Sequence, residues 1–331
     1  VLIGLAGQGK TRGTAAINFS SLCTNQSIAA IYPTDRHSSM FLYYVMDNLY
    51  YELRELSSGD GGRGGLTKSL IKNIFVQYPY IDEQQKIAEV LSDIDDLIFS
   101  LEKLIAKKKA VKQGTMQELL TGKKRLPGFS GEWNNYIIGE MGTFYNGLSG
   151  KSKKDFDCGD AFFITFLNVL SNVKIDTSIL ASVNVKENES QNTVQKGDLF
   201  FNTSSETSEE VGMCAVLDES LKNTYLNSFC FGFRLNDDSQ NSLFLSYYLN
   251  SPIGRKIMSV LAQGATRYNL SKNNFSETVI RLPSKEEQTS IASILSDMDD
   301  EIEVLEQKLE KYRQVKQGMI QQLLTGKIRL V

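Results

Sequence analysis

Two stretches of the chain repeat hydrophobic residues at alternating steps of four and three positions, with polar or charged residues at most positions between them. They cover residues 81–126 and 285–330. This spacing is the heptad pattern of a coiled coil and predicts two helices of about 38 residues, each roughly 57 Å long. The predicted seam consists of Ile87, Leu91, Ile94, Ile98, Leu101 and Ile105 in the first helix and Ile291, Leu295, Met298, Ile302, Leu305 and Leu309 in the second.

The two stretches are copies of one another. They align without a gap at an offset of 204 residues, so that LSDIDD matches LSDMDD, VKQG recurs unchanged and QELLTGK matches QQLLTGK. A lone helix of this length with an apolar stripe is not stable in water, so we expect the two copies to pair with each other. Ser284 and Glu287 predict a capping box at the start of the second helix, and Gly122 and Gly326 predict the helix ends.

The repetition extends upstream of each helix, where LTKSLIKNIFVQYP (66–79) aligns with LSKNNFSETVIRLP (270–283). The chain is therefore predicted to hold two copies of a domain followed by a helix. The first domain is cut short, and we expect the natural N-terminus to be missing. The predicted parts are a partial first domain at 1–80, a helix at 81–126, a complete domain at 127–284 and a helix at 285–331. Candidate strands followed by a helix at 242–262, broken near Pro252, predict an α+β fold.

The first residues, VLIGLAGQGKTRG, contain the spelling G-x-x-x-x-G-K-T of a nucleotide-binding P-loop. A P-loop requires a helix that begins directly after the Lys-Thr pair. Here Arg12-Gly13-Thr14 favours a turn into a second strand instead. The second copy aligns LFFNTSSETSEEVGMCAV (199–216) with this segment and has no G-K-T. We therefore expect a hairpin, and a P-loop NTPase at residues 4–11 is the weaker alternative.

Composition narrows the chemistry. The 331 residues carry a net charge of −3, with 41% hydrophobic and 23% charged residues, which is typical of an ordered globular chain whose nucleic-acid surface, if any, is local. Four scattered cysteines and the single histidine, His37, disfavour a zinc site and a Ser-His or Cys-His nucleophile. No catalytic or metal site is predicted. The carboxylates of LSDIDD and LSDMDD are expected to cover a helix flank or to cap a basic patch of a partner, and not to bind metal. Free thiols fit the cytoplasm, and no run of 18 apolar residues predicts a membrane span.

Three motifs carry a family resemblance. The helices begin with DEQ or EEQ and end with Q-x-L-L-T-G-K-x-R-L, PGFSGEW (127–133) directly follows the first helix, and R-x-x-L-[ST]-K precedes each helix at Arg63 and Arg267. In these features the chain resembles the DNA-specificity (S) subunit of Type I restriction–modification systems. The resemblance implies two target recognition domains, the first truncated at its N-terminus, separated by two long helices that pair as an antiparallel coiled coil.

The resemblance also implies a function. Such a subunit is non-catalytic, reads a bipartite double-stranded DNA target with one half per domain, and docks two methyltransferase (modification) subunits and the restriction subunits. S-adenosylmethionine, ATP and Mg are then expected on the partner subunits and no cofactor on this chain. The alternative from heptads alone is a coiled-coil scaffold that binds only protein. The target bases and the spacer length are not predictable from this sequence.

Loops are where DNA contacts are expected, with Arg and Lys suited to guanine or phosphate and Ser and Thr to either. The candidates in the first domain are Gln8, Lys10, Thr11 and Arg12, and their counterparts in the second are Thr203, Ser204, Ser205 and Thr207. The candidates where domain meets helix, together with the lysines of GLSGKSKKDF, are Arg63, Lys68, Arg267, Tyr268, Lys272, Lys151 and Lys153.

Overall fold

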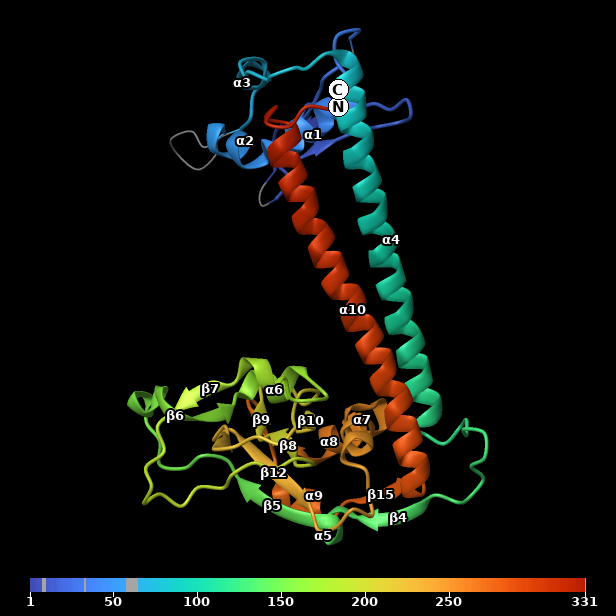
Figure 1. The fold of residues 1–331 in the computed structure, drawn as a ribbon, viewed down its shortest axis with the longest axis vertical. Coiled ribbons are helices and arrows are strands. Elements are labelled where there is room, and N and C mark those ends of the chain that lie inside the picture. Colours follow the sequence, from blue (N-terminus) through green and yellow to red (C-terminus); the bar gives the residue numbers. More distant parts are fainter. Residues whose placement is uncertain (8–9, 33, 58–64, 331) are drawn as a thin grey trace. The chain divides into compact units, whose positions relative to one another are not determined.

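The computed structural model describes residues 1–7, 10–32, 34–57 and 65–330, and the chain divides into two compact units (Figure 1). Unit 1 comprises Val1–Lys107 and Ile302–Val331, and unit 2 comprises Lys108–Glu301. Each unit combines strands and short helices, here called its body, with a segment of both long helices. The predicted α+β fold is confirmed. The four-part division of the chain into domains and helices stays a prediction.

Both long helices end just before the predicted glycines. Helix α4 spans Ile81–Leu119 and α10 spans Lys285–Leu323, so each has 39 residues and equivalent ends. Gly122 and Gly326 follow them with φ of 68° and 69°. Their amides donate to the carbonyls of Leu119 and Leu323, each over 3.2 Å. These are the left-handed caps that favour glycine.

The predicted capping box is half right. The Glu287 amide donates to Ser284 Oγ over 3.4 Å, as expected for a capping serine. The Glu287 carboxylate, however, accepts from Arg125 Nε over 2.6 Å instead of turning back to the helix start. A charge-assisted bond to guanidinium is stronger than one to a neutral amide. The equivalent pair in unit 1 is Glu83 with Arg329, 2.6 Å apart, and Arg329 lowers the pKa of Glu83.

The helices run antiparallel within each unit. In unit 1, Asp95 pairs with Lys316 at 2.6 Å and Glu102 pairs with Arg313 at 2.7 Å, so residue numbers rise along α4 as they fall along α10. The same order holds in unit 2 for the pairs Lys108–Glu301 and Arg125–Glu287. The predicted antiparallel pairing is therefore confirmed.

The heptad seam serves two partners. Ile87 and Leu91 are buried in the main hydrophobic cluster of unit 1, and Ile291 and Leu295 in that of unit 2. A separate cluster in unit 1 joins the two helices to each other and consists of Ile98, Leu101, Ile105, Leu305, Leu309 and Tyr312. The start of each seam thus anchors the helix to a body, and its later positions hold the helix pair together.

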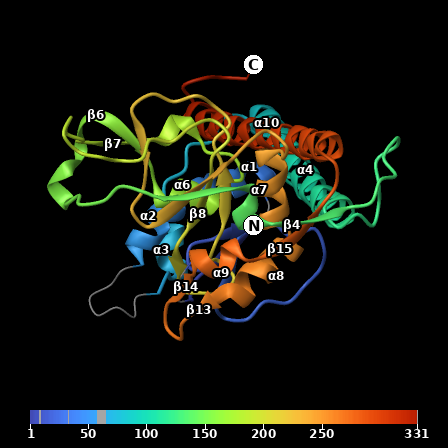
Figure 2. The same cartoon turned by 90° about the horizontal axis from the view of Figure 1, so that it is seen from below.

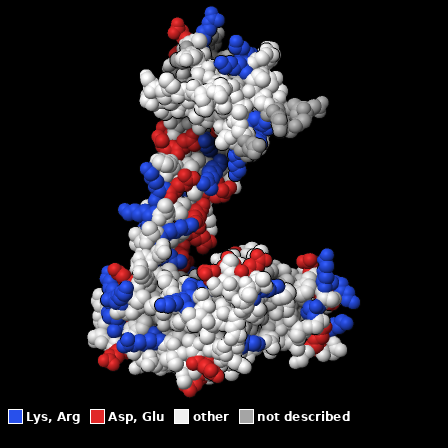
Figure 3. Space-filling view, turned by 180° about the vertical axis from the view of Figure 1, so that it is seen from behind, with Lys and Arg blue, Asp and Glu red and all other residues white. Residues whose placement is uncertain are grey.

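Polar residues cover most of the other faces of the helices, as the heptad pattern predicts. Figure 3 shows Lys and Arg side chains interleaved with Asp and Glu along the helical part of the molecule. Within the described part of the chain, no helix combines the length and the apolar character needed to cross a membrane.

Unit 2 is built around an antiparallel sheet with strand order β10-β8-β12-β5. Its strands are β5 (Gly142–Asn146), β8 (Leu199–Asn202), β10 (Cys214–Val216) and β12 (Cys230–Leu235). Smaller sheets contain β4 (Asn134–Ile137), β6 (Phe156–Ile164), β7 (Ala181–Val183), β9 (Ser204–Ser205), β11 (Thr224–Leu226), β13 (Ala262–Gln263), β14 (Tyr268–Leu270) and β15 (Val279–Leu282). In Figures 1 and 2 alike, β6 and β7 lie on the side of unit 2 away from α10.

The predicted break at Pro252 is confirmed. Helix α7 (Ser242–Asn250) stops before it, and α8 (Pro252–Leu261) starts on it with Ser251 as the N-cap. Proline suits the first helical position because its missing N–H has no partner there in any case. The other short helices of unit 2 are α5 (Ile138–Met141), α6 (Phe166–Ser171), α9 (Lys272–Ser276) and two 3₁₀ turns at Lys153–Asp155 and Thr177–Ile179.

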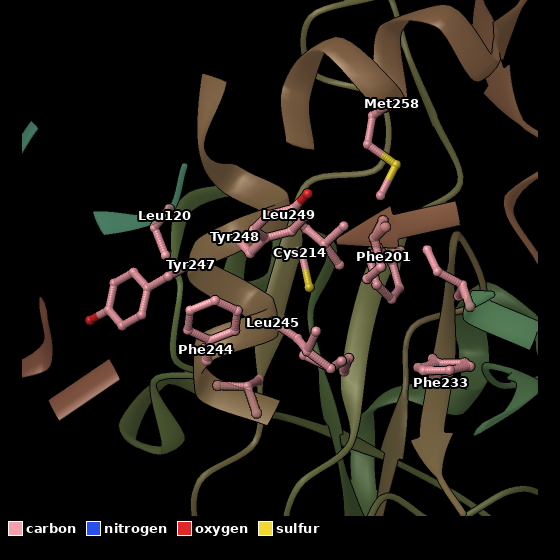
Figure 4. Packing of buried hydrophobic residues seen from close by; sticks show 14 of the residues in the cluster. Leu120, Phe201, Cys214, Phe233, Phe244, Leu245, Tyr247, Tyr248, Leu249 and Met258 are labelled. Atoms are coloured by element: carbon pink, nitrogen blue, oxygen red, sulfur yellow. The ribbon is translucent and has the colours of Figure 1, made fainter. Parts of the chain in front are cut away.

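Helix α7 supplies much of the core of unit 2. Figure 4 shows its aromatic and aliphatic side chains packed toward Phe201, Cys214 and Phe233 of the main sheet. Tyr247 differs from its neighbours, because its hydroxyl points out of the hydrophobic cluster. That hydroxyl donates to Asp299 Oδ2 of α10 over 2.7 Å.

Unit 1 repeats part of this plan. Its sheet has the order β2-β1-β3, formed by β1 (Leu2–Gly4), β2 (Ala15–Ala16) and β3 (Ile28–Ala30), and its helices are α1 (Ser39–Asn48), α2 (Tyr50–Leu56) and α3 (Lys68–Lys72). Leu2 lies opposite Ala16, just as Phe200 lies opposite Ala215 in unit 2. In the described part of unit 1, β3 pairs with β1 alone, whereas β12 lies between β8 and β5.

Candidate nucleic-acid interface

The first candidate loop joins β1 and β2 in a hairpin. The Gly4 amide donates to the Thr14 carbonyl over 3.0 Å, and the Gly13 amide donates to the Gly4 carbonyl over 2.8 Å. The chain therefore returns as a strand after Lys10 and Thr11, where a P-loop would continue as a helix. The P-loop alternative is wrong for this reason, and the predicted hairpin is correct.

Lys10 and Thr11 lie at the exposed end of this hairpin. The loop is attached to α2, because the Tyr50 hydroxyl donates to the Lys10 carbonyl over 3.1 Å. Arg12 is partly buried beside them. The backbone of Lys10 is therefore anchored to α2, while its side chain lies in solvent.

Lys68 and Arg63 are separate from this hairpin in sequence. Lys68 is exposed in the first position of α3, where Thr67 caps the helix. Gln8 and Arg63 lie outside the described residues, and their predicted roles stay predictions.

Unit 2 brings four of the predicted residues together. Strand β9 pairs with β14 so that Ser205 lies opposite Tyr268, and Ser204 lies opposite Asn269. Arg267 Nε donates to Ser204 Oγ over 3.2 Å. Ser204 is only 6% exposed, whereas Arg267 is exposed. The buried serine therefore orients the arginine, and the arginine is the side chain that reaches solvent.

The rest of this loop carries acidic side chains. Ser205 Oγ donates to Glu210 over 2.8 Å, and the Thr207 amide donates to Ser205 Oγ over 3.4 Å. Thr207 is exposed next to Glu206 and Glu209, while Thr203 is half-buried. Carboxylates repel phosphate but accept hydrogen bonds from the amino group of cytosine. The loop is chemically suited to base edges more than to the DNA backbone.

Two residues that shape this loop escaped the sequence analysis. Asn202 is fully buried, donates to the carbonyls of Ser204 and Glu210, and accepts the Met213 amide over 2.7 Å. Arg255 of α8 donates to the Gly212 carbonyl over 2.9 Å. An asparagine at a strand end is a recognisable signal for a turn. Nothing local marks Arg255, because its partners are more than forty residues away.

The remaining lysines differ in their surroundings. The Lys151 side chain is 4% exposed, forms an ion pair with Glu189 and donates to the Asn184 carbonyl over 2.6 Å. Its charge is therefore used inside unit 2, which does not fit the predicted contact with DNA. Lys153 is exposed in a 3₁₀ turn. Lys272 donates to Asn146 Oδ1 and lies 5.8 Å from the centre of the Phe231 ring.

Comparison with known proteins identifies these bodies. The family model for the Type I restriction modification DNA specificity domain matches residues 3–113 and again residues 130–313. The chain belongs to this family. The two matches agree with the internal repeat, and the predicted family resemblance is confirmed.

Two relatives with similar sequences are named as specificity subunits of type I restriction enzymes. The chain is 26% identical over 287 residues to the putative type I restriction enzyme MjaX specificity subunit of Methanocaldococcus jannaschii. The aligned region covers 81% of this chain and 62% of that protein. It is 26% identical over 310 residues to the MjaVIII specificity subunit of the same organism, over 86% of this chain and 71% of that protein. The chain thus spans less than two thirds of the length of the first of these relatives.

Solved structures confirm the fold. The S subunit of a Type I restriction–modification system from M. genitalium superposes with a TM-score of 0.56 at 16% identity, covering 86% of this chain and 72% of that chain. A chain from a study of complex assembly and conformational transition of the type I R-M system gives a TM-score of 0.51 at 15% identity over 90% and 74% of the two chains. Two recognition domains with paired long helices are the fold of this family.

Specificity subunits are the non-catalytic members of their complexes, and membership of the family gives this chain the same standing. Within the described residues, no cluster of three or more His, Cys, Asp or Glu side chains is arranged to hold a metal ion.

Proposed function

We propose that this chain recognises a bipartite double-stranded DNA target for a Type I restriction–modification complex, with each body reading one half of the target. The observation that carries the proposal is the repeated hairpin. The β1–β2 loop and the β8–β10 loop occupy equivalent places in two bodies that both match a DNA specificity domain. Two equivalent loops on one chain suit two half-sites.

The two loops differ in chemistry, and so we expect them to read different bases. The first presents Lys10 and Thr11, which suit guanine edges or phosphate. The second presents Thr207 among glutamates, with Arg267 held beside it by Ser204. We assign phosphate contact to Arg267, Lys68 and Lys272, because phosphate contacts position a domain on the duplex.

The long helices are proposed to set the spacing between half-sites and to dock two methyltransferase subunits and the restriction subunits. Two copies whose helices pair antiparallel are proposed to read half-sites on opposite strands. Half-sites one turn apart are about 34 Å from centre to centre, within the span of helices of this length. Exposed apolar side chains on the helices, including Phe99 and Val304 at 55% and 62% exposure, support a docking role.

The chemistry of the complex is proposed to reside on those partners. Methyl transfer would use S-adenosylmethionine on the modification subunits, and cleavage would use ATP and Mg on the restriction subunits. This chain would supply only the recognition of the DNA target. Its acidic net charge of −3 agrees with DNA affinity that depends on basic partners.

Methylome sequencing tests the proposal. A host that expresses the chain with its modification subunit should acquire methylation at one bipartite motif with a fixed spacer, absent from a host that expresses the modification subunit alone. A protein-binding scaffold would form the complex without changing the motif. Methylation that does not depend on the chain, or a motif in one undivided block, would overturn the proposal.

A further inference from the structure

One polar contact joins the body of unit 1 to both of its long helices. Tyr44 of α1 donates its hydroxyl hydrogen to Asp95 Oδ2 of α4 over 2.9 Å. Lys316 of α10 lies 2.6 Å from the other oxygen of the same carboxylate. Its Nζ is also 5.7 Å from the centre of the Tyr44 ring. Three elements thus meet at one carboxylate, and we call these three residues the unit 1 clasp.

Unit 2 contains the same contact at equivalent positions. Tyr247 of α7 donates to Asp299 Oδ2 of α10 over 2.7 Å. Lys112 of α4 forms an ion pair with Oδ1 of Asp299 and lies 5.5 Å from the centre of the Tyr247 ring. These three residues are the unit 2 clasp. The helices have exchanged roles, as the repeat requires.

The clasps explain two segments that the repeat shares. Asp95 and Asp299 are the fifth residues of LSDIDD and LSDMDD, and Lys112 and Lys316 are the lysines of VKQG. The carboxylates were expected to cover a helix flank or a basic patch. Asp95 and Asp299 lie at the junction of three elements, where each also pairs with a lysine of the other long helix. The chain therefore brings its two repeated motifs together within each unit.

Packing alone does not require these groups. The two tyrosines are 2% and 0% exposed, and a phenylalanine would fill the same space. Burial and the bonded carboxylate raise the pKa of both tyrosine hydroxyls, which keeps them protonated as donors. A buried hydroxyl requires a hydrogen-bond partner. In both units that partner lies on a long helix and not on the helix that carries the tyrosine.

The clasp supplies direction that the hydrophobic contact lacks. Ile87 and Leu91 bind α4 to the body of unit 1 by apolar burial, which has little dependence on orientation. Hydrogen bonds weaken steeply as their angles depart from the optimum, and charge-assisted bonds are the strong ones. A body held by both kinds of contact cannot rotate on its helix pair without breaking the second.

We propose that the two clasps are positioning devices that fix the orientation of each recognition body on its helices and so fix the spacer length that the protein accepts between half-sites. The inference rests on the proposed function. It assigns Tyr44, Asp95, Lys316, Tyr247, Asp299 and Lys112 a role in the geometry of recognition, without contact to DNA.

The experiment measures methylation by the full chain with its modification subunit on targets whose spacer varies in steps of one base pair. Wild-type protein should prefer one spacer. Y44F and Y247F keep the packing and remove the donor, and each should reduce the preference for that spacer over its neighbours about tenfold, the effect of losing one hydrogen bond to a charged group. Activity on the native spacer should change little. D93N and D297N, which alter exposed equivalents in the same motifs, serve as matched controls.

The outcomes distinguish failure of the clasp proposal from failure of the proposed function. Unchanged spacer preference in both tyrosine variants, with native melting curves, would overturn the clasp and leave the proposed function standing. An equal loss of methylation at every spacer would show a structural role alone, and would also overturn it. Wild-type methylation without a bipartite motif would remove the proposed function and the clasp with it. Should Y44F melt early, D95N combined with Y44F supplies the second measurement, because members of one contact give non-additive losses of spacer preference.

Discussion

At the scale of single residues, Arg267 and Lys151 carry the same charge in different surroundings. Arg267 is exposed and is held at one nitrogen by Ser204. The Lys151 side chain is 4% exposed and faces Glu189 and a backbone carbonyl. A cation that already forms an ion pair within the protein must break that pair before it can bind a phosphate. A guanidinium that is bonded through one nitrogen is oriented by that bond and keeps its other N–H groups for a phosphate. Surface charge therefore has to be judged with its partners in view.

The R267A variant should bind target DNA about tenfold more weakly than wild type, and the salt dependence of its affinity should fall by about one phosphate contact. The reason is that Arg267 is assigned to the DNA backbone. K196A is the control, because Lys196 is an exposed lysine of unit 2 whose nearest ion pair, with Asp218, is a loose 3.9 Å. Affinity can be measured by fluorescence anisotropy over a salt titration with the modification subunit present. Equal curves for R267A and K196A would contradict the assignment.

At the scale of elements, the helix ends allow a matched comparison. Gly122 and Gly326 have the same positive φ, but a Cβ at Gly122 would lie 3.3 Å from Trp133 Cε2, whereas no described atom lies within 4 Å of a Cβ at Gly326. G326A should therefore show the conformational cost alone, about 1 kcal/mol, and G122A should lose more. Urea unfolding followed by circular dichroism measures both. Equal losses would mean that the indole moves aside freely.

The same elements show what a sequence can and cannot predict. Heptad spacing and terminal glycines are sufficient to predict α4 and α10, and Pro252 is sufficient to predict the break between α7 and α8. Each of these signals acts on the segment in which it lies. Glu287 was assigned to its own helix start and instead pairs with Arg125. Contacts such as Tyr247 with Asp299 or Lys151 with Glu189 depend on how distant segments meet, which spacing along the chain does not encode.

At the scale of the whole molecule, the two units are unequal versions of one plan. Both have the hairpin, the following strand, a capped helix and a clasp on the long helices. In unit 2 the strand that follows the hairpin, β12, is paired on both sides. In the described part of unit 1 its counterpart, β3, is paired on one side. Open edges lower the free energy needed for local opening, because fewer contacts must be broken.

Hydrogen exchange should resolve this difference at single amides. The Ile31 amide donates to the Val1 carbonyl over 2.8 Å, so the amides of Ala29 and Ile31 point toward β1 and those of Ile28 and Ala30 point away from it. Ala30 should exchange faster than Ala29 and Ile31 by on the order of tenfold or more, after correction for sequence. The Ile28 amide does not enter this comparison, because it donates to the Asn25 carbonyl over 3.3 Å. In unit 2 the counterpart of Ala30 is Gly232, which lies opposite Tyr145 of β5 and opposite Phe200 of β8. Its exchange should be as slow as that of its neighbours, which makes β12 the internal control. Slow exchange at Ala30 would mean that another strand covers this edge, and the two units would then be equal at this strand.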